Sequence, residues 1–577
     1  MKQRRIERRA LRADARFPAS LHPLLQRIYA ARDVGDDMEL DNALTALHDF
    51  HGFHNMDAAV ALLTDAMQRQ RSILIVGDFD ADGATSSALA VRALRGLGAR
   101  QVDYLVPNRF EYGYGLTPEI VALAAQRRPD LIITVDNGIA SLAGVAAARK
   151  AGIQVLVTDH HLPAAELPDA DAILNPNLPG DGFPSKCLAG VGVVFYLLLA
   201  LRAHLRERDW FGAHAIPEPN LAAYLDIVAL GTVADLVPLD HNNRVLVAQG
   251  LARIRAGRSV PGIRALLELG NRELQRLTAA DLGFTVAPRI NAAGRLTDMS
   301  LGIECLLTDD MARAQTLAVR LDELNRERRD IEARMQDDAL QTLERMGFNA
   351  DDPALPFGLC LLHEDWHQGV VGLVASRIKE RVHRPVIAFA RAAGDTLKGS
   401  ARSVKGVHIR DALEAVATRH PGLIGKFGGH AMAAGLTLAA DQFAPFAQAF
   451  DAEVRRWLSV DDLAGVMRTD GELTPEFLTL ECAELLRQAG PWGQGFPEPC
   501  FDGVFRLLQR RIVGNGHLKL ALAETASGLR VEAIAFNQTG EHLPAACTRV
   551  RIVYRPDVNA YRGEQRLQLL VDYIEPV

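Results

Sequence analysis

The most constraining feature of the sequence is a short apolar run that leads directly into three aspartates. Residues 73–83 read ILIVGDFDADG, which places Asp78, Asp80 and Asp82 just after the apolar residues. The apolar run predicts a buried strand of a parallel sheet. Strand alternation predicts that the three carboxylates project to one side at its carboxyl end, where doubly wound sheets bind ligands. Crowded carboxylates favour a bound Mg²⁺ or Mn²⁺. A solvated acidic turn is the alternative.

The surrounding residues alternate between strand-like and helical patterns. Strands are predicted at 73–76, 102–106, 131–135, 154–158 and 172–174, and helices such as 86–97 and 118–126 lie between them. This alternation predicts an α/β fold with a mostly parallel, doubly wound sheet. Residues 21–70 are predicted to be helical from the spacing of Leu24, Leu25, Ile28, Leu44, Leu47, Ala61 and Leu62.

Polar side chains follow each of the central strands of this predicted sheet. The second strand runs into Asn108 and Arg109, the third into Asp136, and the fourth into Asp159, His160 and His161. The carboxyl ends of parallel strands lie on one edge of a sheet, so these side chains are expected to converge. Carboxylates together with an imidazole indicate a site for two divalent manganese or magnesium ions.

Two further aspartates lie in the strongly apolar segment at residues 225–237, LDIVALGTVADLV. Asp235 is the better candidate for a metal ligand, because the Leu-Val-Pro that follows it is expected to end the helix and leave the carboxylate at a terminus. A buried structural aspartate or a helix cap is the alternative for Asp226 and Asp235.

Four motifs in this order, GDFDADG, VDNG, TDHH and GTVADLVPL, resemble those of the DHH phosphoesterase superfamily. Five further segments narrow the resemblance to the RecJ family of single-strand-specific 5′→3′ DNA exonucleases: NRFEYGYGL, APRINAAGRL, WHQGVVGLVASRIKE, KGSARS and GKFGGHAMAAGLTL. The resemblance extends over about residues 73–438. It implies two-metal hydrolysis of single-stranded DNA to 5′-mononucleotides in recombination and repair.

The resemblance also implies roles for individual residues. The expected metal ligands are Asp78, Asp80, Asp82, Asp136, His160 and Asp235, with Asp136 bridging the ions and Asp78 completing the set. His161 is expected to contact the scissile phosphate, and Asp159 to orient the imidazoles. Superfamily members that hydrolyse pyrophosphate carry a histidine just ahead of the two aspartates, and this sequence has none there.

Substrate phosphates are expected to meet arginine and other fixed donors. The candidates are Asn108, Arg109, Arg289, Asn291, Arg295, Ser376, Arg377, Arg402, Gly428, Gly429 and His430. The resemblance implies that the second domain grips the 5′ end and leaves a cleft too narrow for a duplex. Without it, the segment around Gly428 and Gly429 reads equally well as a tight turn followed by a helix of small residues.

The remaining chain is predicted to form three more parts. Charged and apolar residues recur at helical spacing over 309–347, which predicts a long linking helix. A second α/β domain, the DHH-associated domain, is expected from near Phe357. Five closely spaced strands after about residue 465 predict a small barrel of the OB-fold type. The expected boundaries are 1–45 for an N-terminal arm and helices, 46–305 for the DHH catalytic domain, 306–350 for the linking helix, 351–460 for the second domain and 465–577 for the barrel.

The barrel strands carry many basic residues, with aromatic residues nearby, which is typical of a single-strand-binding groove. They are Arg506, Arg510, Arg511, Lys519, Arg530, Arg551, Arg555 and Arg566, with Tyr554 and Tyr561. A solvated basic face is the alternative. Overall the net charge is −7, so any binding of nucleic acid must come from local basic surface.

Composition and missing motifs exclude several classes of protein. Six scattered cysteines without CxxC spacing argue against a thiolate zinc site and predict reduced cytosolic thiols. The basic N-terminus lacks the apolar core of a secretory signal and is expected to be a frayed arm. No P-loop, GxSxG or HExxH motif is present. We therefore expect a cytoplasmic monomer without membrane contact, and the resemblance implies a single-strand-binding protein and a helicase as partners.

Two other functions remain to be distinguished. One is a phosphodiesterase of the same fold that acts on oligonucleotides or cyclic dinucleotides, although such an enzyme has no need of a basic C-terminal barrel. The other is a non-catalytic DNA-binding relative, which is expected to have lost metal ligands that this sequence retains.

Overall fold

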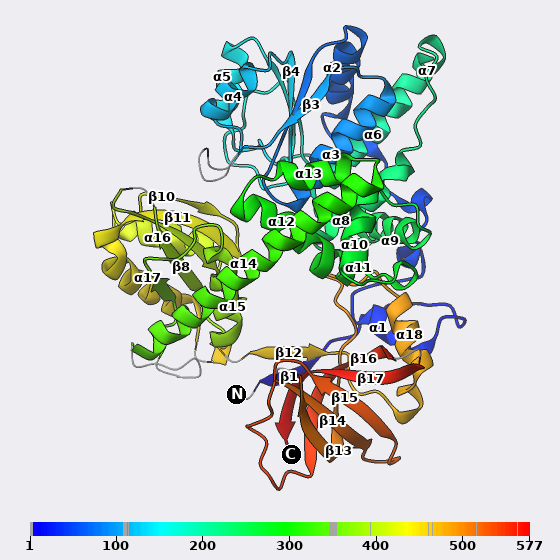
Figure 1. The fold of residues 1–577 in the computed structure, drawn as a ribbon, viewed down its shortest axis with the longest axis vertical. Helices are drawn as coiled ribbons and strands as arrows, with labels where there is room; N and C mark the ends of the chain where they lie inside the picture. The colour runs from blue at the N-terminus through cyan, green and yellow to red at the C-terminus, as the bar shows by residue number, and fades with distance from the viewer. Residues whose placement is uncertain are drawn as a thin grey trace. The chain divides into compact units, whose positions relative to one another are not determined.

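The computed structural model describes residues 4–107, 112, 115–345, 355–392, 394–459, 461–463, 465–514, 516–561 and 564–577. The chain divides into two compact units (Figure 1). One comprises Ala10–Asn325 and Leu485–Glu498, and the other comprises Met1–Arg9, Arg326–Glu484 and Pro499–Val577. We describe each unit by itself.

The first unit contains the predicted parallel sheet. Its strands are β2 (Ile73–Gly77), β3 (Val102–Leu105), β4 (Leu131–Val135), β5 (Gln154–Thr158) and β6 (Ala172–Leu174). They lie in the order β3-β2-β4-β5-β6, and every neighbouring pair is parallel. The prediction of a mostly parallel α/β sheet is therefore confirmed.

Helices cover both faces of this sheet. On one face Leu74 and Val76 pack with α4 (Pro118–Ala125) and α5 (Leu142–Lys150). The other residues of the same strand, Ile73 and Ile75, are equally buried, and α3 (Ala81–Leu97) and α6 (Gly190–Glu207) also contact the strands. Strands buried on both faces explain the continuous apolar runs in the sequence.

The structure corrects the predicted placement of the first three aspartates. Strand β2 ends at Gly77, and α3 begins at Ala81 rather than at Ser86. Asp80 is the N-cap of α3, and Asp82 lies in its first turn. Strand alternation therefore does not align these carboxylates, and a tight strand-to-helix turn brings them together.

The helices before the sheet differ from the prediction. Only α1 (Pro23–Ala30) and α2 (Met56–Gln68) are α-helical, and short 3₁₀ turns occupy 38–40, 44–46 and 50–52. In α2 the buried residues include Ala59, Val60 and Leu63, whereas Ala61 is exposed. The run AAVALL is apolar all round, so its sequence did not fix which stripe faces the core.

A helical layer follows the sheet in the first unit. Its members are α7 (Trp210–Ala213), α8 (Leu225–Ala234), α9 (His241–Arg255), α10 (Pro261–Leu269), α11 (Ala279–Asp281), α12 (Ala287–Leu296) and α13 (Ser300–Leu307). A π-helical turn over Leu282–Val286 leads into α12. Helices α8 and α12 both pack against α3, which carries Asp80 and Asp82 at its amino end.

One continuous helix, α14 (Met311–Arg345), runs from the first unit into the second. It occupies most of the predicted span 309–347, and residues 346 and 347 lie outside the described part of the chain. Its buried apolar residues include Leu321, Leu324, Met335 and Leu343. A single amphipathic helix thus accounts for the apolar stripe.

The second α/β domain contains a mixed sheet of β7 (Leu359–Leu362), β8 (Val386–Arg391), β9 (Thr396–Arg402), β10 (Lys426–Gly429) and β11 (Ala433–Ala439), in the order β10-β11-β9-β8-β7. Helices α15 (Val371–Val382), α16 (Ile409–Arg419) and α17 (Phe443–Trp457) complete the domain. The alternative of a small-residue helix after Gly429 is wrong, because Ala434, Leu436 and Leu438 alternate into the core as a strand.

The C-terminal strands form a closed barrel in the order β13-β14-β15-β17-β16, which confirms the predicted barrel. They are β13 (Phe501–Val513), β14 (His517–Glu524), β15 (Arg530–Ala535), β16 (Arg549–Tyr561) and β17 (Glu564–Pro576). Tyr554, predicted to lie beside a binding groove, is instead fully buried against Phe501 and Phe505. It is a core residue and cannot stack on a base.

The basic N-terminal segment is a strand rather than a frayed arm. Strand β1 (Arg5–Arg8) pairs in parallel with β12 (Val466–Thr469). Arg8 also donates to the buried carboxylate of Asp502 at 3.3 and 3.1 Å. Backbone pairing and this ion pair fasten the segment to the second unit.

Across the described residues, no helix combines the length and hydropathy needed to cross a bilayer. The six cysteines form no disulfide.

Candidate metal centre

Asp136 lies at the carboxyl end of β4 in a conformation that few non-glycine residues adopt, with a φ of 59°. The next side chain, Asn137, donates to the carbonyls of Val76 at 3.1 Å and Val135 at 2.9 Å, which ties the ends of β2 and β4 together. Gly190 approaches from α6, where an added Cβ would lie only 2.6 Å from the Cβ of Asp136. Close backbone packing therefore fixes the position of the Asp136 carboxylate.

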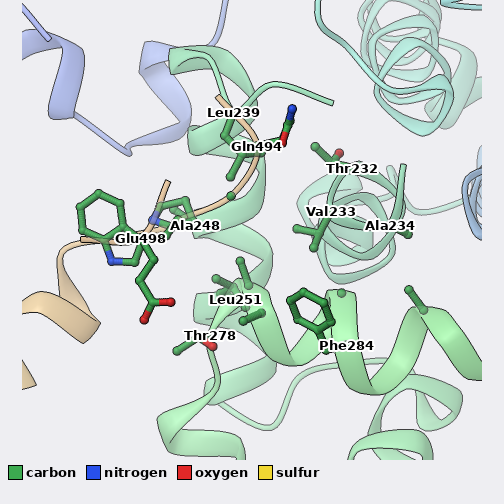
Figure 2. Close-up of a pocket in the computed structure, with 18 of the residues that line it drawn as sticks. Thr232, Val233, Ala234, Leu239, Ala248, Leu251, Thr278, Phe284, Gln494 and Glu498 are labelled. Atoms are coloured by element: carbon green, nitrogen blue, oxygen red, sulfur yellow. The ribbon is translucent and has the colours of Figure 1, made fainter. Parts of the chain in front are cut away.

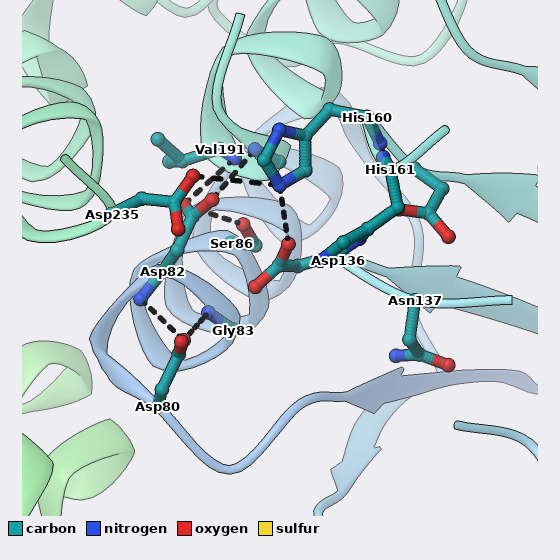
Figure 3. Close-up of polar contacts among 12 residues, drawn as sticks. Asp80, Asp82, Gly83, Ser86, Asp136, Asn137, His160, His161, Val191 and Asp235 are labelled. Carbon is teal, nitrogen blue, oxygen red and sulfur yellow. Dashed lines mark hydrogen bonds and ion pairs between the residues drawn. The ribbon is translucent and has the colours of Figure 1, made fainter. Parts of the chain in front are cut away.

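The amino ends of two helices meet at Asp80 and Asp82 (Figure 3). Asp80 Oδ1 accepts from the backbone N–H groups of Asp82 at 2.9 Å and Gly83 at 3.1 Å. The buried Asp82 carboxylate accepts from the backbone of Gly190 at 2.6 Å and Val191 at 3.0 Å. The amino end of α6 thus directs its N–H groups and its positive partial charge at Asp82.

The histidine pair follows β5 and is organised by Asp159. Asp159 Oδ1 accepts from the backbone N–H groups of His160 at 2.7 Å and His161 at 3.1 Å, and it lies 2.7 Å from His161 Nδ1. Asp159 Oδ2 accepts from the backbone of Ile139 at 2.9 Å. Although burial opposes ionisation, the hydrogen bond from His161 holds the pKa of Asp159 below its ordinary value. Asp159 is therefore a buried carboxylate that supports the His160–His161 loop.

The two aspartates of α8 have different surroundings. Asp235, the C-cap of α8, places Oδ2 3.5 Å from His160 Nε2, and the same nitrogen lies 3.1 Å from Asp136 Oδ1. In Figure 3 the carboxylates of Asp235 and Asp136 both turn toward the His160 ring. Asp226, at the other end of α8, accepts from the backbone of Val260 at 2.7 Å. Only Asp235 belongs to the cluster.

Three overlapping sets of side chains bring potential ligand atoms within 4.8 Å of one another. The sets are Asp136–His160–His161, Asp82–His160–Asp235 and Asp78–Asp80–Asp136. They include every residue predicted as a metal ligand, together with His161. Asp136 and His160 each belong to two sets, and of these two side chains the carboxylate has two oxygens with which to serve two ions.

The electrostatics of this cluster suit a divalent cation. Burial and the charge of Asp80 raise the pKa of Asp82 to about 7. Burial and the charge of Asp82 raise the pKa of Asp136 and of Asp235 well above the ordinary value. Carboxylate oxygens and imidazole are the ligands that manganese and magnesium sites use. The donor set therefore fits divalent metal ions, whose charge would relieve the repulsion.

The predicted substrate-binding residues of the first unit are not all free to meet a substrate. Asn108 and Arg109 lie outside the described residues. Arg289 is buried, and it donates to Asp322 at 2.9 Å and to the carbonyl of Thr285. The side chains of α12 are thus partly committed to contacts within the protein.

Two other candidates lie on the same helix. Asn291 Oδ1 accepts from the backbone N–H of Ala81 at 2.9 Å. Arg295 is half-buried in the last turn of α12. The structure thus places Asn291 beside the turn that leads from β2 into α3.

In the second unit the candidates lie on α15, on strands β9 and β10, and at His430 in the turn after β10. Ser376 is half-buried, and the exposed Arg377 forms an ion pair with Glu332 of α14 at 3.0 Å. Arg402 in β9 donates to Ser400 Oγ at 3.1 Å. Glu332 was not singled out from the sequence, since it is one of many charged residues on a long helix.

The paired glycines of β10 differ from each other. A Cβ on Gly428 would meet no atom within 4 Å, so its face is open. Gly429 has a φ of 145°, and a Cβ there would lie 2.5 Å from the backbone of Ala434. His430 follows Gly429 and donates its backbone N–H to Ala433 at 2.8 Å. Gly429 is therefore required by the turn between β10 and β11, whatever ligand it meets.

Sequence reasoning missed the residues that support the metal centre through their backbone. Gly190 and Val191 act through backbone N–H groups, and Asn137 acts through an amide that spans two strands. The only available signal was the small-residue start of α6, AGVG, because helix amino ends with small residues are common anion sites.

A cavity of about 640 Å³ lies beside the centre in the first unit (Figure 2). Its lining is largely apolar and includes Val233, Ala234, Leu251 and Phe284. It extends to both neighbours of Asp235 and to Asn291. The cavity therefore borders the segment that carries Asp235.

A parallel sheet whose carboxyl edge carries Asp136 and the Asp159-His160-His161 triplet defines a DHH-type phosphoesterase. Residues 72–232 match the DHH family N-terminal domain, residues 356–456 match the DHHA1 domain, and residues 469–573 match the RecJ OB domain. These matches fall within the predicted segments 46–305, 351–460 and 465–577.

The chain is 56% identical to the single-stranded-DNA-specific exonuclease RecJ of Dickeya dadantii, over 99% of each chain. The crystal structure of RecJ with Mn²⁺ from Thermus thermophilus superimposes with a TM-score of 0.78 and 31% identity, covering 96% of this chain and 76% of that chain. Its Mg²⁺ counterpart has a TM-score of 0.73 and 30% identity, covering 96% and 75%. The chain belongs to the RecJ family.

Proposed function

We propose that the chain is a metal-dependent exonuclease that degrades single-stranded DNA from its 5′ end and releases 5′-mononucleotides in DNA recombination and repair. The observation that carries this proposal is the cluster of three overlapping groups of potential ligands, which share Asp136 and His160. The relative from Dickeya dadantii is named a single-stranded-DNA-specific exonuclease, and the two RecJ structures from Thermus thermophilus contain Mn²⁺ or Mg²⁺.

We propose Asp78, Asp80, Asp82, Asp136, His160 and Asp235 as the ligands of two divalent ions, with Asp136 shared between them. Two such ions, when bound, activate a water nucleophile and neutralise charge on the phosphate and on the leaving oxygen. The protein orients this set through the Asp80 cap, the α6 amino end on Asp82 and the Asn137 link.

His161 is proposed to donate a hydrogen bond or a proton to the scissile phosphate. Burial lowers the pKa of His161, but the hydrogen bond and the charge of Asp159 outweigh it, and the net pKa is raised. Because Asp159 lies 2.7 Å from Nδ1, we propose Nε2 as the nitrogen that faces the phosphate. Asp159 therefore positions His161 and keeps it protonated to higher pH.

DNA phosphates are proposed to meet donors from both units. Arg295 and Arg289 in the first unit, together with Asn108 and Arg109, are the candidates nearest to the DHH motifs in sequence. In the second unit the candidates are Ser376, Arg377, Arg402, Gly428, Gly429 and His430. For the buried Arg289, the ion pair with Asp322 supports an additional structural role.

The family's roles in recombination and repair extend the proposal to partners. We propose a single-strand-binding protein and a helicase as partners, a monomeric state and a cytoplasmic location. Co-purification from cells and the mass measured by light scattering test these statements.

The direct test uses 5′-end-labelled single-stranded DNA with Mn²⁺, alongside the matched duplex and an Asp136→Ala variant. We expect labelled mononucleotide from the single strand only, and none from the variant. Equal attack on the duplex would contradict the single-strand specificity. Retained binding without any release of nucleotide from the unmodified protein would identify a non-catalytic DNA-binding protein.

A further inference from the structure

We propose that α12 is a positioning element for the metal-binding turn, and that Asn291 and Gly294 act on residues 78–82 rather than on DNA. The inference rests on the proposed metal-dependent function, because it concerns how the ligands Asp78 and Asp80 are held. Asn291 and Gly294 lie in the segment APRINAAGRL, for which a substrate contact was the first expectation.

The amino end of α3 leaves four backbone N–H groups without partners in its own helix. The Asp80 side chain serves two of them, because it accepts from Asp82 at 2.9 Å and from Gly83 at 3.1 Å. A third N–H, that of Ala81, donates to Asn291 Oδ1 at 2.9 Å. Asn291 therefore extends the cap from another helix, and the position of α3 depends on α12.

Gly294 lies one turn further along α12 and contacts the same turn. A Cβ added to Gly294 would lie 1.9 Å from the backbone carbonyl oxygen of Phe79. Real Cβ atoms do not approach an oxygen this closely, so any side chain here must displace either α12 or the turn. Phe79 stands between Asp78 and Asp80, which means that the displaced segment is the one that carries two proposed ligands.

The turn is also confined from its other side. A Cβ on Gly83 would lie 2.5 Å from the carbonyl oxygen of Asp78. The segment from Asp78 to Asp80 is therefore packed between α3 and α12 with backbone in contact on both sides. Metal sites tolerate shifts of only about 0.2 Å in ligand distance, so a displaced turn is expected to weaken the site.

The polar groups of α12 point to the same role. The side-chain carbonyl of Asn291 accepts from the backbone N–H of Ala81. The buried Arg289 donates to Asp322 and to the carbonyl of Thr285. The groups that these two side chains contact all belong to the protein. A positioning role therefore explains Asn291, whereas Arg289 is held by contacts elsewhere in the first unit.

The test compares Asn291→Leu, Asn291→Asp and Gly294→Ala with the unmodified protein. The asparagine variants differ in whether they keep an oxygen that can accept from Ala81. Gly96→Ala is the matched glycine control, because it lies on α3 and its Cβ would meet only ordinary contacts at 3.6 and 3.7 Å. Two quantities are measured: Mn²⁺ affinity without DNA, from the free-ion EPR signal, and affinity for single-stranded DNA in chelator, from fluorescence anisotropy.

We expect Asn291→Leu and Gly294→Ala to weaken Mn²⁺ binding about 10- to 100-fold, as is usual for residues that support metal ligands. Affinity for single-stranded DNA in chelator should stay within about twofold of the value for the unmodified protein, because these substitutions remove no contact with a DNA phosphate. Asn291→Asp and Gly96→Ala should keep most of the Mn²⁺ affinity.

The opposite pattern, with DNA affinity lost in chelator and Mn²⁺ affinity unchanged, would assign α12 to the substrate and overturn the proposal. Equal Mn²⁺ affinity in all four variants would also overturn it. If Gly294→Ala does not fold, as judged by circular dichroism, the two Asn291 variants decide. Absence of Mn²⁺ binding to the unmodified protein would instead refute the proposed metal-dependent function.

Discussion

The carboxyl edge of the parallel sheet and the outer surface of the barrel both collect charged side chains, but they balance them differently. At the sheet edge, the buried Asp82 and Asp136 lie with the half-buried Asp235, and burial and neighbouring carboxylates raise the pKa of all three. On the barrel, Arg555 pairs with Asp572 at 3.0 Å, and Lys519 pairs with Glu532 at 2.8 Å. A buried excess of one charge indicates a ligand site, whereas paired surface charges contribute little to binding or stability.

The largest expected effect distinguishes two aspartates of the same helix, the half-buried Asp235 and the buried Asp226. Asp235→Asn should lower the rate of DNA hydrolysis about 10³-fold, which corresponds to about 4 kcal/mol of transition-state stabilisation. Asp226→Asn should leave the rate nearly unchanged, because Asp226 contacts the backbone of Val260 and lies outside the cluster. Single-turnover hydrolysis of labelled single-stranded DNA measures both variants.

Asp226→Asn is the control for simply neutralising a buried carboxylate on α8. Thermal unfolding should show that both variants are folded. A comparable loss of activity in the two variants would mean that α8 acts through stability, and the contrast between cluster and non-cluster carboxylates would fail.

A smaller effect is expected at the carboxylate that supports the histidine pair. Asp159→Asn replaces one acceptor oxygen with an amide, and the amide cannot accept from all four N–H donors that Asp159 now serves. The hydrolysis rate should fall about 10- to 100-fold, as for other residues that orient ligands. The pH–rate profile should also change, because His161 loses the carboxylate that raises its pKa.

The readout that separates this role from simple destabilisation is the acidic shift of the His161 titration, followed by NMR of the imidazole. An unchanged profile with a uniformly lower rate would show that Asp159 only stabilises the loop.

The sheet edge could be predicted from the sequence because its chemistry is local. Each strand end places its functional residue within two or three positions of an apolar run, as Asp136 follows Leu131–Val135. Parallel pairing then brings the strand ends together without further information. The exact placement of Asp80 and Asp82 could not be predicted in this way, because the Gly77 strand end and the Asp80 helix cap replace strand alternation with a turn.

The barrel shows the opposite case. Its five strands were predicted, but the environment of each charged or aromatic residue depends on strand register and closure. Tyr554 lies in the core, and Arg555 pairs with Asp572 of the neighbouring strand β17. The sequence of one strand alone specifies neither contact. Supporting contacts made by backbone groups, such as those of Gly190 and Val191, carry no side-chain signal at all.

The raised pKa of Asp82, about 7, gives a pH-dependent prediction for the sheet edge. A carboxyl group with a raised pKa in the fold destabilises the metal-free protein as pH rises from about 4 to above 7. Metal ions must displace the proton, so Mn²⁺ affinity should rise by about tenfold or more between pH 6 and pH 7.

Isothermal titration in buffers of different ionisation enthalpy reports the number of protons released on Mn²⁺ binding. At pH 6 we expect release of about one proton or more per site. Mn²⁺ affinity that is independent of pH across this range would show that the cluster is fully ionised without metal.

The smallest expected effect lies on the barrel. Arg506 in β13 stands directly opposite Arg549 in β16, and neither forms an ion pair within the described part of the chain. Like charges opposite each other are unfavourable in a sheet unless an anion lies between them. Arg506→Gln should therefore weaken binding of single-stranded DNA about fivefold and reduce the salt dependence by about 0.7 in slope.

Arg555→Gln is the matched control on the same barrel, because Arg555 is already paired with Asp572. It should change affinity less than Arg506→Gln, since its charge is largely neutralised before DNA binds. Anisotropy titrations at several salt concentrations, performed in chelator, compare the two slopes. Equal salt-dependence slopes for the two variants would show that ion pairing within the protein does not predict which barrel arginines bind DNA. Unbalanced charge would then indicate a ligand site at the sheet edge but not on the barrel.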